Sequence, residues 1–364
     1  MKNKECLTYD DVQIIPKYSE LEHRSDCNLS SRITKTRNLR IPIVSAPMDS
    51  ITEYEMAYGM WNFGGLGVIH RFMSIENQCK IIEKLKTQIE YDWVGMKTLD
   101  ISNELKGWFN NPPLCAAIGV TKGYFRRAQK LISSGCNILL IDVAHGHHKL
   151  VKEALGRLKN EFGEDVEIIG GCIATKEAAR DLCEWGADGL RVGIGNGSLC
   201  ETRIRTGVGI PQVSALLDIC PVADDYNVPV IADGGIRYVG DVCKGLGVGS
   251  DAVMLGSLLS GTKETPGEIS KIGMWPNEQL YKKYRGSASL DSKLDRGEDK
   301  DVEGNSKLIP YKGKLRRILG DIIDGIRSSM SYVGAKDLEE YRSLVEFVRV
   351  TESGVVEAQP HLMK

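Results

Sequence analysis

The residues from 193 to 203 combine a glycine-rich backbone with two side chains suited to covalent and anion chemistry. The segment reads Gly-Ile-Gly-Asn-Gly-Ser-Leu-Cys-Glu-Thr-Arg, so three alternating glycines precede Ser198 and Cys200. Such glycines let backbone amides and carbonyls turn inward around an ion or a phosphate. A thiol on this loop, beside backbone dipoles and Arg203, has the setting of an activated nucleophile. The residues alone leave a second interpretation open, in which the cysteine is incidental.

Small polar residues also occur at Asp233-Gly234-Gly235 and at Gly256-Ser257. Glycine-rich ends of the last strands in barrel enzymes often bind phosphate through backbone N–H groups and a helix N-terminus. The carboxylate of Asp233 can accept hydrogen bonds from both hydroxyls of a ribose. The pattern favours a nucleotide site, although ordinary strand-end turns use the same residues.

Other chemistry-bearing residues give weaker signals. His145, His147 and His148 cluster, but carboxylate partners with ligand spacing are missing, so solvated or structural histidines are favoured over a metal site. The ten cysteines form no CxxC pair, which argues against zinc, and about nine should be buried, reduced thiols of a cytoplasmic protein. A GxGxxG fingerprint is absent after the first strand, so any nicotinamide cofactor is expected on a barrel rim.

The elements that must position these residues are short aliphatic runs separated by helical patterns. Because the runs are apolar nearly throughout, they predict parallel strands buried on both faces. Eight strand–helix repeats predict a single-domain (β/α)8 TIM barrel over residues 1–364, with an open doubly wound sheet as the alternative. The predicted strands are Ile41–Met48, Leu66–His70, Leu114–Val120, Asn137–Val143, Val166–Ile173, Gly189–Gly195, Val228–Ile236 and Asp251–Gly256.

Two segments depart from this alternation. The cysteine loop, residues 193–212, is too long for a plain turn. The polar segment 284–312 is predicted to be a mobile surface loop, and long loops of this kind are often lids. The connection 71–113 is too short to hold a further domain. The segment Leu315–Leu338 is expected to be helical and to close back on the barrel.

Composition excludes several classes of function. The chain has 364 residues, 42% hydrophobic and 26% charged, with a formal net charge of -2. Nucleic-acid and membrane binding are not expected, because both favour a basic surface. No apolar run reaches the roughly 18 residues of a membrane span, and the polar residues at Tyr9-Asp10-Asp11 argue against a signal peptide.

The chain resembles the IMP dehydrogenase/GMP reductase family from end to end. The resemblance rests on Leu7–Val12, Ser45–Thr52, Gly193–Gln212, Ile231–Arg237 and Ala252–Glu268. It implies an oxidoreductase of purine mononucleotides in which Cys200 forms a covalent adduct at purine C2. Family members are tetramers, so a homotetramer is expected.

The resemblance also implies roles for other positions. Ser198, Gly235, Gly256, Ser257 and Tyr284 match phosphate contacts, and Asp233 matches the ribose contact. Met48, Arg191 and Gly286 match positions that line the nucleotide pocket, while Asp142 and Gly193 match the nicotinamide side. The carbonyls of Gly195, Gly197 and Cys200 match a monovalent cation site, for which potassium is the expected ion. Thr202 and Glu303 match the catalytic threonine and glutamate of the reductases.

The two branches of the family differ in the fate of the adduct. A dehydrogenase passes hydride to NAD and hydrolyses the adduct, using an Arg-Tyr pair on a long flap to activate water. A reductase expels ammonia from GMP and takes hydride from NADPH. In this chain Gly286 to Glu303 spans 18 residues without an Arg-Tyr pair, and the CBS pair of many dehydrogenases is missing. A short-flap GMP reductase is therefore expected.

Several residues depart from the reductase pattern and keep alternatives open. Residues 232–237 and 208–212 are more typical of a dehydrogenase, in which Arg296 would stand in as the base. Cys172 replaces the usual Asn, and Glu201 lies beside the nucleophile, where it is expected to point to solvent. These changes, together with Asn196, also motivate a third hypothesis, a nucleotide-binding protein without turnover.

Overall fold

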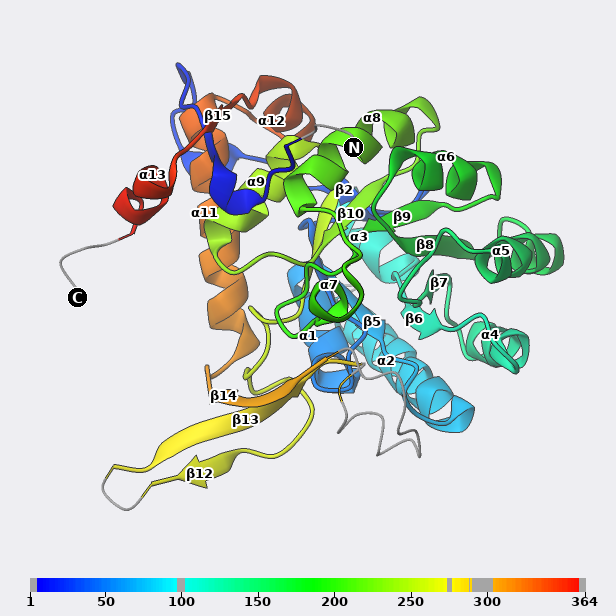
Figure 1. The fold of residues 1–364 in the computed structure, drawn as a ribbon. Helices are drawn as coiled ribbons and strands as arrows, with labels where there is room; N and C mark the ends of the chain where they lie inside the picture. The colour runs from blue at the N-terminus through cyan, green and yellow to red at the C-terminus, as the bar shows by residue number, and fades with distance from the viewer. Residues whose placement is uncertain (1–4, 97–101, 274–276, 288, 290–303, 360–364) are drawn as a thin grey trace.

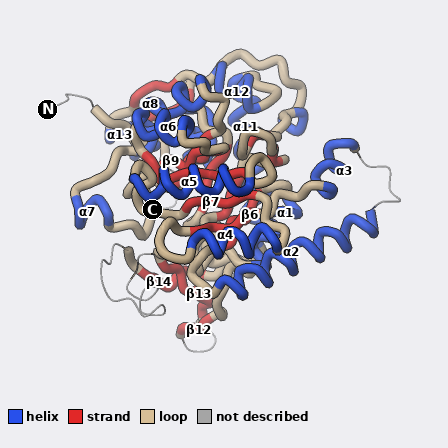
Figure 2. The backbone as a smooth tube through the Cα atoms, turned by 90° about the vertical axis from the view of Figure 1, so that its right-hand side faces the viewer, coloured by secondary structure: helices blue, strands red, loops and turns tan. Residues whose placement is uncertain are grey.

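The fold is a closed barrel of eight parallel strands surrounded by helices (Figures 1 and 2). The computed structural model describes residues 5–96, 102–273, 277–287, 289 and 304–359. The barrel strands are β4 (Ile43–Ser45), β5 (Leu66–Ile69), β6 (Cys115–Ile118), β7 (Ile138–Ile141), β8 (Glu167–Ile173), β9 (Gly189–Val192), β10 (Val230–Asp233) and β11 (Ala252–Leu255). Each pairs with the next along the chain, and β11 pairs back with β4. Closure confirms the barrel and excludes the open sheet.

The barrel strands are buried on both faces, which explains why continuous apolar runs in the sequence predicted them. Every residue of β7, Ile-Leu-Leu-Ile, is buried, as is every residue of β8. One face of each strand packs inside the barrel and the other packs against helices, so continuous apolar runs are required. All eight predicted strands occur, each somewhat shorter than its apolar run because the ends turn into rim loops.

Helices follow each strand and form the outer layer (Figure 2). They are α1 (Tyr54–Phe63), α2 (Ile75–Met96), α3 (Asn103–Asn110), α4 (Tyr124–Ser133), α5 (Lys149–Phe162), α6 (Lys176–Glu184), α7 (Thr202–Thr206), α8 (Gln212–Asp225), α9 (Val239–Val248), α11 (Leu315–Val333), α12 (Leu338–Leu344) and α13 (Glu352–Glu357). Two of them, α2 and α3, lie in the connection between β5 and β6. None of the described helices is long and apolar enough to cross a membrane.

The predicted C-terminal helix is present, with one break. Helix α11 buries Leu319, Ile322, Ile326 and Met330 on one face and packs against α9. It ends where Gly334 adopts a left-handed conformation with φ 79°. A glycine there satisfies the helix terminus without a Cβ clash. The chain then continues into α12.

Three further sheets lie outside the barrel. Strands β1 (Val12–Ile14) and β15 (Phe347–Arg349) pair antiparallel, as do β2 (Ser31–Arg32) and β3 (Asn38–Leu39). The third sheet, here called the arm, contains β12 (Ser270–Ile272), β13 (Gln279–Arg285) and β14 (Ser306–Pro310). The arm projects from the barrel at the lower left of Figure 1.

The prediction that residues 284–312 form one loop was wrong at both ends of the segment, which belong to strands of the arm. Tyr284 and Arg285 end β13, and residues 306–310 form β14, paired with β13 in antiparallel register. Such a sheet can leave one face in water, so charged residues within it do not prevent strand formation. The polar composition of this segment was therefore a poor guide to its two ends.

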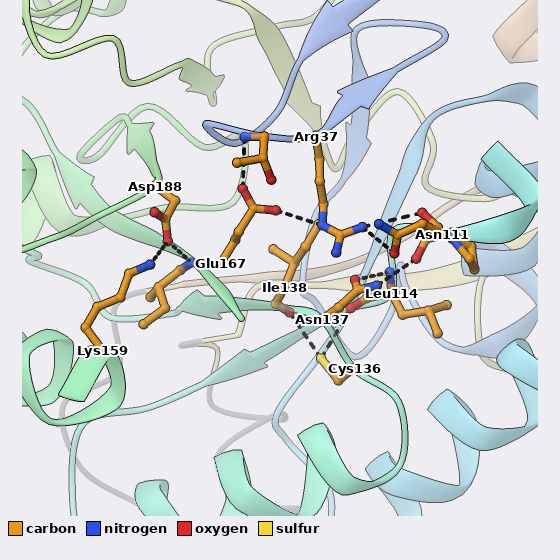
Figure 3. A network of polar contacts seen from close by, with 12 residues as sticks. Arg37, Asn111, Leu114, Cys136, Asn137, Ile138, Lys159, Glu167 and Asp188 are labelled. Atoms are coloured by element: carbon orange, nitrogen blue, oxygen red, sulfur yellow. Dashed lines mark hydrogen bonds and ion pairs between the residues drawn. The ribbon is translucent and has the colours of Figure 1, made fainter. Parts of the chain in front are cut away.

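Charged groups at the amino end of the barrel pair with one another (Figure 3). Arg37 lies 2.7 Å from Glu167, and Lys159 lies 2.7 Å from Asp188. Asp188 also accepts the N–H of Ile168 at 2.7 Å. In this fold the amino end usually serves stability and the carboxyl end chemistry. These pairs fit the first role.

Candidate active site

One cavity of about 820 Å³ opens at the carboxyl ends of the strands. It falls within the roughly 300–1,000 Å³ typical of small-molecule sites. Fifteen of the sixteen predicted site residues line it: Met48, Asp142, Arg191, Gly193, Gly195, Gly197, Ser198, Cys200, Thr202, Asp233, Gly235, Gly256, Ser257, Tyr284 and Gly286. The sixteenth, Glu303, lies outside the described residues, as does Arg296. Residues from five barrel strands and their loops, and from the arm, thus meet in one space.

The thiol of Cys200 is exposed within this cavity. Its Sγ lies 3.1 Å from the Oγ1 of Thr202. The backbone of Cys200 forms an isolated antiparallel bridge with Gly304, and the N–H of Asn305 donates to the carbonyl of Leu199 at 3.1 Å. The segment that returns to the arm is therefore tied directly to the cysteine loop. A hydroxyl and an open cavity beside one accessible sulfur suit nucleophilic chemistry.

Arg203 braces the cysteine loop through contacts away from the thiol. Its guanidinium donates to the side chain of Asn196 and to the carbonyl of Ile210. Its stem runs past Gly195 and Gly209, where an added Cβ would lie 2.6 Å from Arg203 atoms. The sequence predicted only that Arg203 flanks the thiol and did not predict that it holds the loop together. Gly195 and Gly209 are required because they leave room for the Arg203 side chain.

Glu201 is also placed differently from the expectation. Its carboxylate lies 2.6 Å from the Nε of Arg205 and accepts a hydrogen bond from Asn305. Only 19% of the side chain is exposed. A cation and an amide on neighbouring elements satisfy the carboxylate, so it links the cysteine loop to the chain entering β14 instead of pointing to solvent.

A buried arginine joins two carboxylates at the centre of the cavity. Arg191 lies 2.9 Å from Asp142 and 2.8 Å from Asp233. Asp142 also accepts from the Nε of Arg71 at 3.2 Å. Burial alone would lower the pKa of Arg191, but the two carboxylates raise it above its ordinary value. The guanidinium stays charged and holds both carboxylates at the rim.

The predicted phosphate contacts meet around Gly256. An added Cβ at Gly256 would lie 3.2 Å from the Tyr284 hydroxyl and 3.3 Å from the Met48 sulfur, so only glycine leaves this space open. Tyr284 and Ser198 share a hydrogen bond of 3.1 Å. Hydroxyls and a bare backbone thus surround one end of the cavity, as an anion site requires.

Other cavity residues received no role from sequence reasoning. Cys172 lines the cavity, and burial raises the pKa of its thiol to about 12. Arg71, Phe72 and Arg127 also line the cavity. Arg71 comes two residues after β5, and this place at a strand end was the signal that could have identified it.

Most of the other thiols are buried, and two histidines of the 145–148 cluster make structural contacts. Eight cysteines are buried, while Cys6 and Cys200 are exposed, so the expectation of nine was one too high because Cys6 lies near the terminus. His147 lies 2.8 Å from Asp181, and the His148 side chain caps α5. Among the described residues no group of three His, Cys, Asp or Glu side chains could hold a metal ion.

The backbone carbonyls expected to bind a monovalent cation lie in the same loop. The carbonyl of Gly197 already accepts the N–H of Cys200 at 3.0 Å. One of the three expected ligands is thus engaged within the loop, and a bound potassium ion stays a prediction.

Known proteins resemble this chain along almost its whole length. The family model described as IMP dehydrogenase / GMP reductase domain matches residues 6–361. Inosine-5'-monophosphate dehydrogenase from Cryptosporidium parvum is 36% identical, over 98% of this chain and 94% of that protein. GMP reductase from Leishmania donovani is 32% identical, over 98% of this chain and 97% of that protein.

A solved structure agrees in fold as well as sequence. A variant of GMP reductase from Trypanosoma brucei, in complex with guanosine 5'-monophosphate, superposes with a TM-score of 0.87 and 31% identity. The match covers 99% of this chain and 98% of that one. Members of the matched family are purine nucleotide oxidoreductases. This chain, with its closed barrel and its cysteine loop at the rim, belongs to the IMP dehydrogenase / GMP reductase family.

Proposed function

We propose that the protein is a GMP reductase, which converts GMP and NADPH to IMP, ammonia and NADP. The observation that carries this proposal is the segment from Gly286 to Glu303. It has 18 residues and contains no tyrosine, so it lacks the Arg-Tyr pair that activates water in the dehydrogenases. A covalent adduct that meets no activated water survives long enough to be reduced.

The substrate would lie across the cavity from Gly256 to Asp142. Its phosphate would take hydrogen bonds from Ser198, Tyr284 and Ser257 and lie near Gly235, whose own N–H donates to the carbonyl of Asn196 at 2.8 Å. Its ribose hydroxyls would donate to Asp233, whose carboxylate Arg191 contacts at 2.8 Å. The purine would then lie over the loop that carries Cys200, beside Met48. The T. brucei enzyme, whose solved complex contains GMP, supports this class of substrate.

The proposed chemistry centres on Cys200. Its thiolate adds to C2 of the purine, and the 2-amino group takes a proton and leaves as ammonia, so the enzyme is left with a C2 thioether-type adduct. When bound, NADPH would supply the hydride that C2 accepts; the carbon–sulfur bond would then break, its electrons would return to the Cys200 sulfur as thiolate, and IMP would be released. Thr202, whose hydroxyl lies 3.1 Å from the sulfur, is the described residue positioned to relay a proton there.

The cavity has features that suit a nicotinamide cofactor. Its lining includes Arg71, Phe72 and Arg127, and Arg71 contacts Asp142 at 3.2 Å. An aromatic ring and two guanidinium groups suit a ligand with rings and phosphates. These residues would bind and orient the cofactor, and the apolar strand ends would keep water from the reacting carbon.

A two-way spectrophotometric assay tests the proposal. Purified protein with GMP and NADPH should lose the absorbance of reduced nicotinamide and release ammonia in equal amounts. Protein with IMP and NAD should gain that absorbance slowly or not at all. Cys200→Ser should abolish turnover in both directions. Brisk NAD reduction with IMP and no NADPH oxidation with GMP would overturn the proposal.

IMP dehydrogenase is the second candidate. The C. parvum dehydrogenase is 36% identical to this chain, against 32% for the Leishmania reductase. In this case Arg296 would act as the base, and Arg296→Ala should stop XMP release while leaving a burst of NADH. Tight GMP binding without turnover in either assay would instead favour a nucleotide-binding protein.

A further inference from the structure

Two lysines connect the arm to the turn that follows β11. The Nζ of Lys312 donates to the carbonyls of Ser257 at 2.8 Å and Leu258 at 3.1 Å. The Nζ of Lys282 donates to the carbonyls of Thr262 at 3.2 Å and Lys263 at 3.4 Å. It also donates to the carbonyl of Thr265. Lys282 lies on β13 and Lys312 follows β14, so both cations cross from the arm to one turn.

Neither lysine behaves like a surface charge. Lys282 is 2% exposed, and Lys312 is half-buried. The described residues place no carboxylate within ion-pair distance of either ammonium group, and the hydrogen-bond acceptors that they provide are backbone carbonyls. Burying a charge is costly unless its hydrogen bonds are satisfied. Several carbonyls per ammonium meet that condition and suggest a specific role.

The contacts of Lys312 fix the orientation of the peptide groups in the turn after β11, next to the proposed phosphate contact Ser257. A trans peptide is planar, so its C=O and N–H point in opposite directions. An ammonium on the carbonyls of Ser257 and Leu258 therefore turns the N–H groups of Leu258 and Leu259 away from itself. Among the described residues no acceptor takes either N–H. Oriented, unpaired amides next to Ser257 suit an anion.

Lys282 connects the same turn to Tyr284. Alternate residues of a strand point to the same face, so Lys282 and Tyr284 project together from β13. The first contacts the turn after β11, and the second contacts Ser198 at 3.1 Å. Both side chains are buried. The position of the Tyr284 hydroxyl at Gly256 thus depends on how the arm is anchored.

The described part of the chain offers the cavity little free positive charge. Among its residues, the cations that line the cavity are Arg71, Arg127 and Arg191. Arg71 and Arg191 bind carboxylates, and Arg127 donates to Gln78 and to the carbonyl of Met73. The ammonium group of Lys312 donates directly to the carbonyl of Ser257. Its positive charge therefore polarises the peptide groups of the turn.

We propose that Lys282 and Lys312, the lysine clamp, are positioning residues that hold the turn after β11 against the arm and so set the affinity for the nucleotide phosphate. The clamp acts on binding and leaves the chemistry at Cys200 unchanged. This inference rests on the proposed function only in that the ligand is a purine mononucleotide. It is independent of whether the protein reduces GMP or oxidises IMP.

The test compares nucleotides with a nucleoside. Isothermal titration of the full-length protein gives Kd for GMP, IMP and guanosine. Lys312→Met should weaken binding of both nucleotides about tenfold, a loss near 1.4 kcal/mol, and leave guanosine unchanged. Lys312→Arg, which keeps the charge, should recover most of the affinity. Lys307→Met removes an exposed lysine from the same arm and should bind like the parent.

Turnover provides a second measurement. In whichever direction the protein is active, Lys312→Met should raise KM for the nucleotide about tenfold and change kcat less than twofold. Equal loss of guanosine and nucleotide binding, or a fall in kcat alone, would overturn the clamp. If Lys312→Met does not fold, Lys312→Gln makes the same comparison, and full nucleotide affinity in that variant would also overturn it. Failure of the parent protein to bind either nucleotide would instead disprove the proposed function.

Discussion

The Sγ of Cys200 and the Oγ1 of Thr202 lie 3.1 Å apart, where the cysteine loop enters helix α7. The thiol can donate to the hydroxyl, and a thiolate can accept from it. Thr202 is the first residue of α7, so its backbone fixes the hydroxyl relative to the sulfur. The pair is therefore a built feature of the loop, and its contribution can be measured.

Removal of the Thr202 hydroxyl should slow catalysis without preventing binding. Thr202→Val preserves the shape and removes the hydroxyl, so kcat should fall about 10²-fold, the lower range for a lost proton-transfer group. Thr202→Ser keeps the hydroxyl and should stay within tenfold of the parent. Steady-state kinetics at saturating nucleotide measures both. Unchanged kcat in the valine variant would remove Thr202 from the mechanism.

Arg191 should be required for stability as well as for the site. Arg191→Met leaves the half-buried Asp142 and Asp233 without their shared counterion. Breaking a fully buried pair costs about 3–5 kcal/mol, which is an upper bound here because Arg71 still contacts Asp142. The midpoint of denaturant unfolding should fall accordingly. The double variant Asp142→Asn/Arg191→Met carries one carboxylate fewer and should recover part of the loss. Equal stabilities for the single and double variants would show that the carboxylates do not depend on Arg191.

Much of the site could be predicted from sequence because strand ends converge. Asp142, Asp233 and Gly256 end or follow buried strands of a closed barrel, so topology alone brings them to one rim. The side chains that hold the loops of the site in place were not predictable in this way. Arg203 and Lys312 act on backbone carbonyls that become neighbours only when loops pack, and no spacing rule encodes such pairs. Strand β14 was missed because a solvated antiparallel strand has little apolar character.

Thiol chemistry should separate Cys200 from the buried cysteines. Burial raises the pKa of Cys172 to about 12, so it remains a neutral thiol up to about pH 9 although it lines the same cavity. Iodoacetamide at about pH 8, followed by peptide mass spectrometry, should label Cys6 and Cys200 and spare Cys172. GMP should protect Cys200 and leave Cys6 reactive. Labelling of Cys172 in the folded protein would contradict its burial.

Other buried thiols should make the stability of the protein decrease at alkaline pH. Burial raises the pKa of Cys136 to about 12 and that of Cys183 to about 11. A raised folded-state pKa contributes stability that is fully present below the unfolded-state value, about 8.5 for cysteine, and that is lost as the pH rises toward the folded-state value. The free energy of unfolding should therefore fall from about pH 8.5 to about pH 11. A flat profile over that range would be inconsistent with these shifts.

Gly193 should tolerate no side chain. Its φ is 148°, and an added Cβ would lie 1.9 Å from the carbonyl oxygen of Asp233, much closer than packed atoms approach. Relief of that clash requires β9 and β10 to separate at the rim, which displaces Asp233 from Arg191. Gly193→Ala should therefore abolish activity and lower the thermal midpoint by several degrees.

Gly156→Ala is the matched control, because Gly156 lies in α5 with nothing within 4 Å of an added Cβ. That substitution should leave activity unchanged and raise stability by about 0.5–1 kcal/mol through helix propensity. An active, stable Gly193→Ala protein would mean that the backbone of β10 does not hold the rim as described.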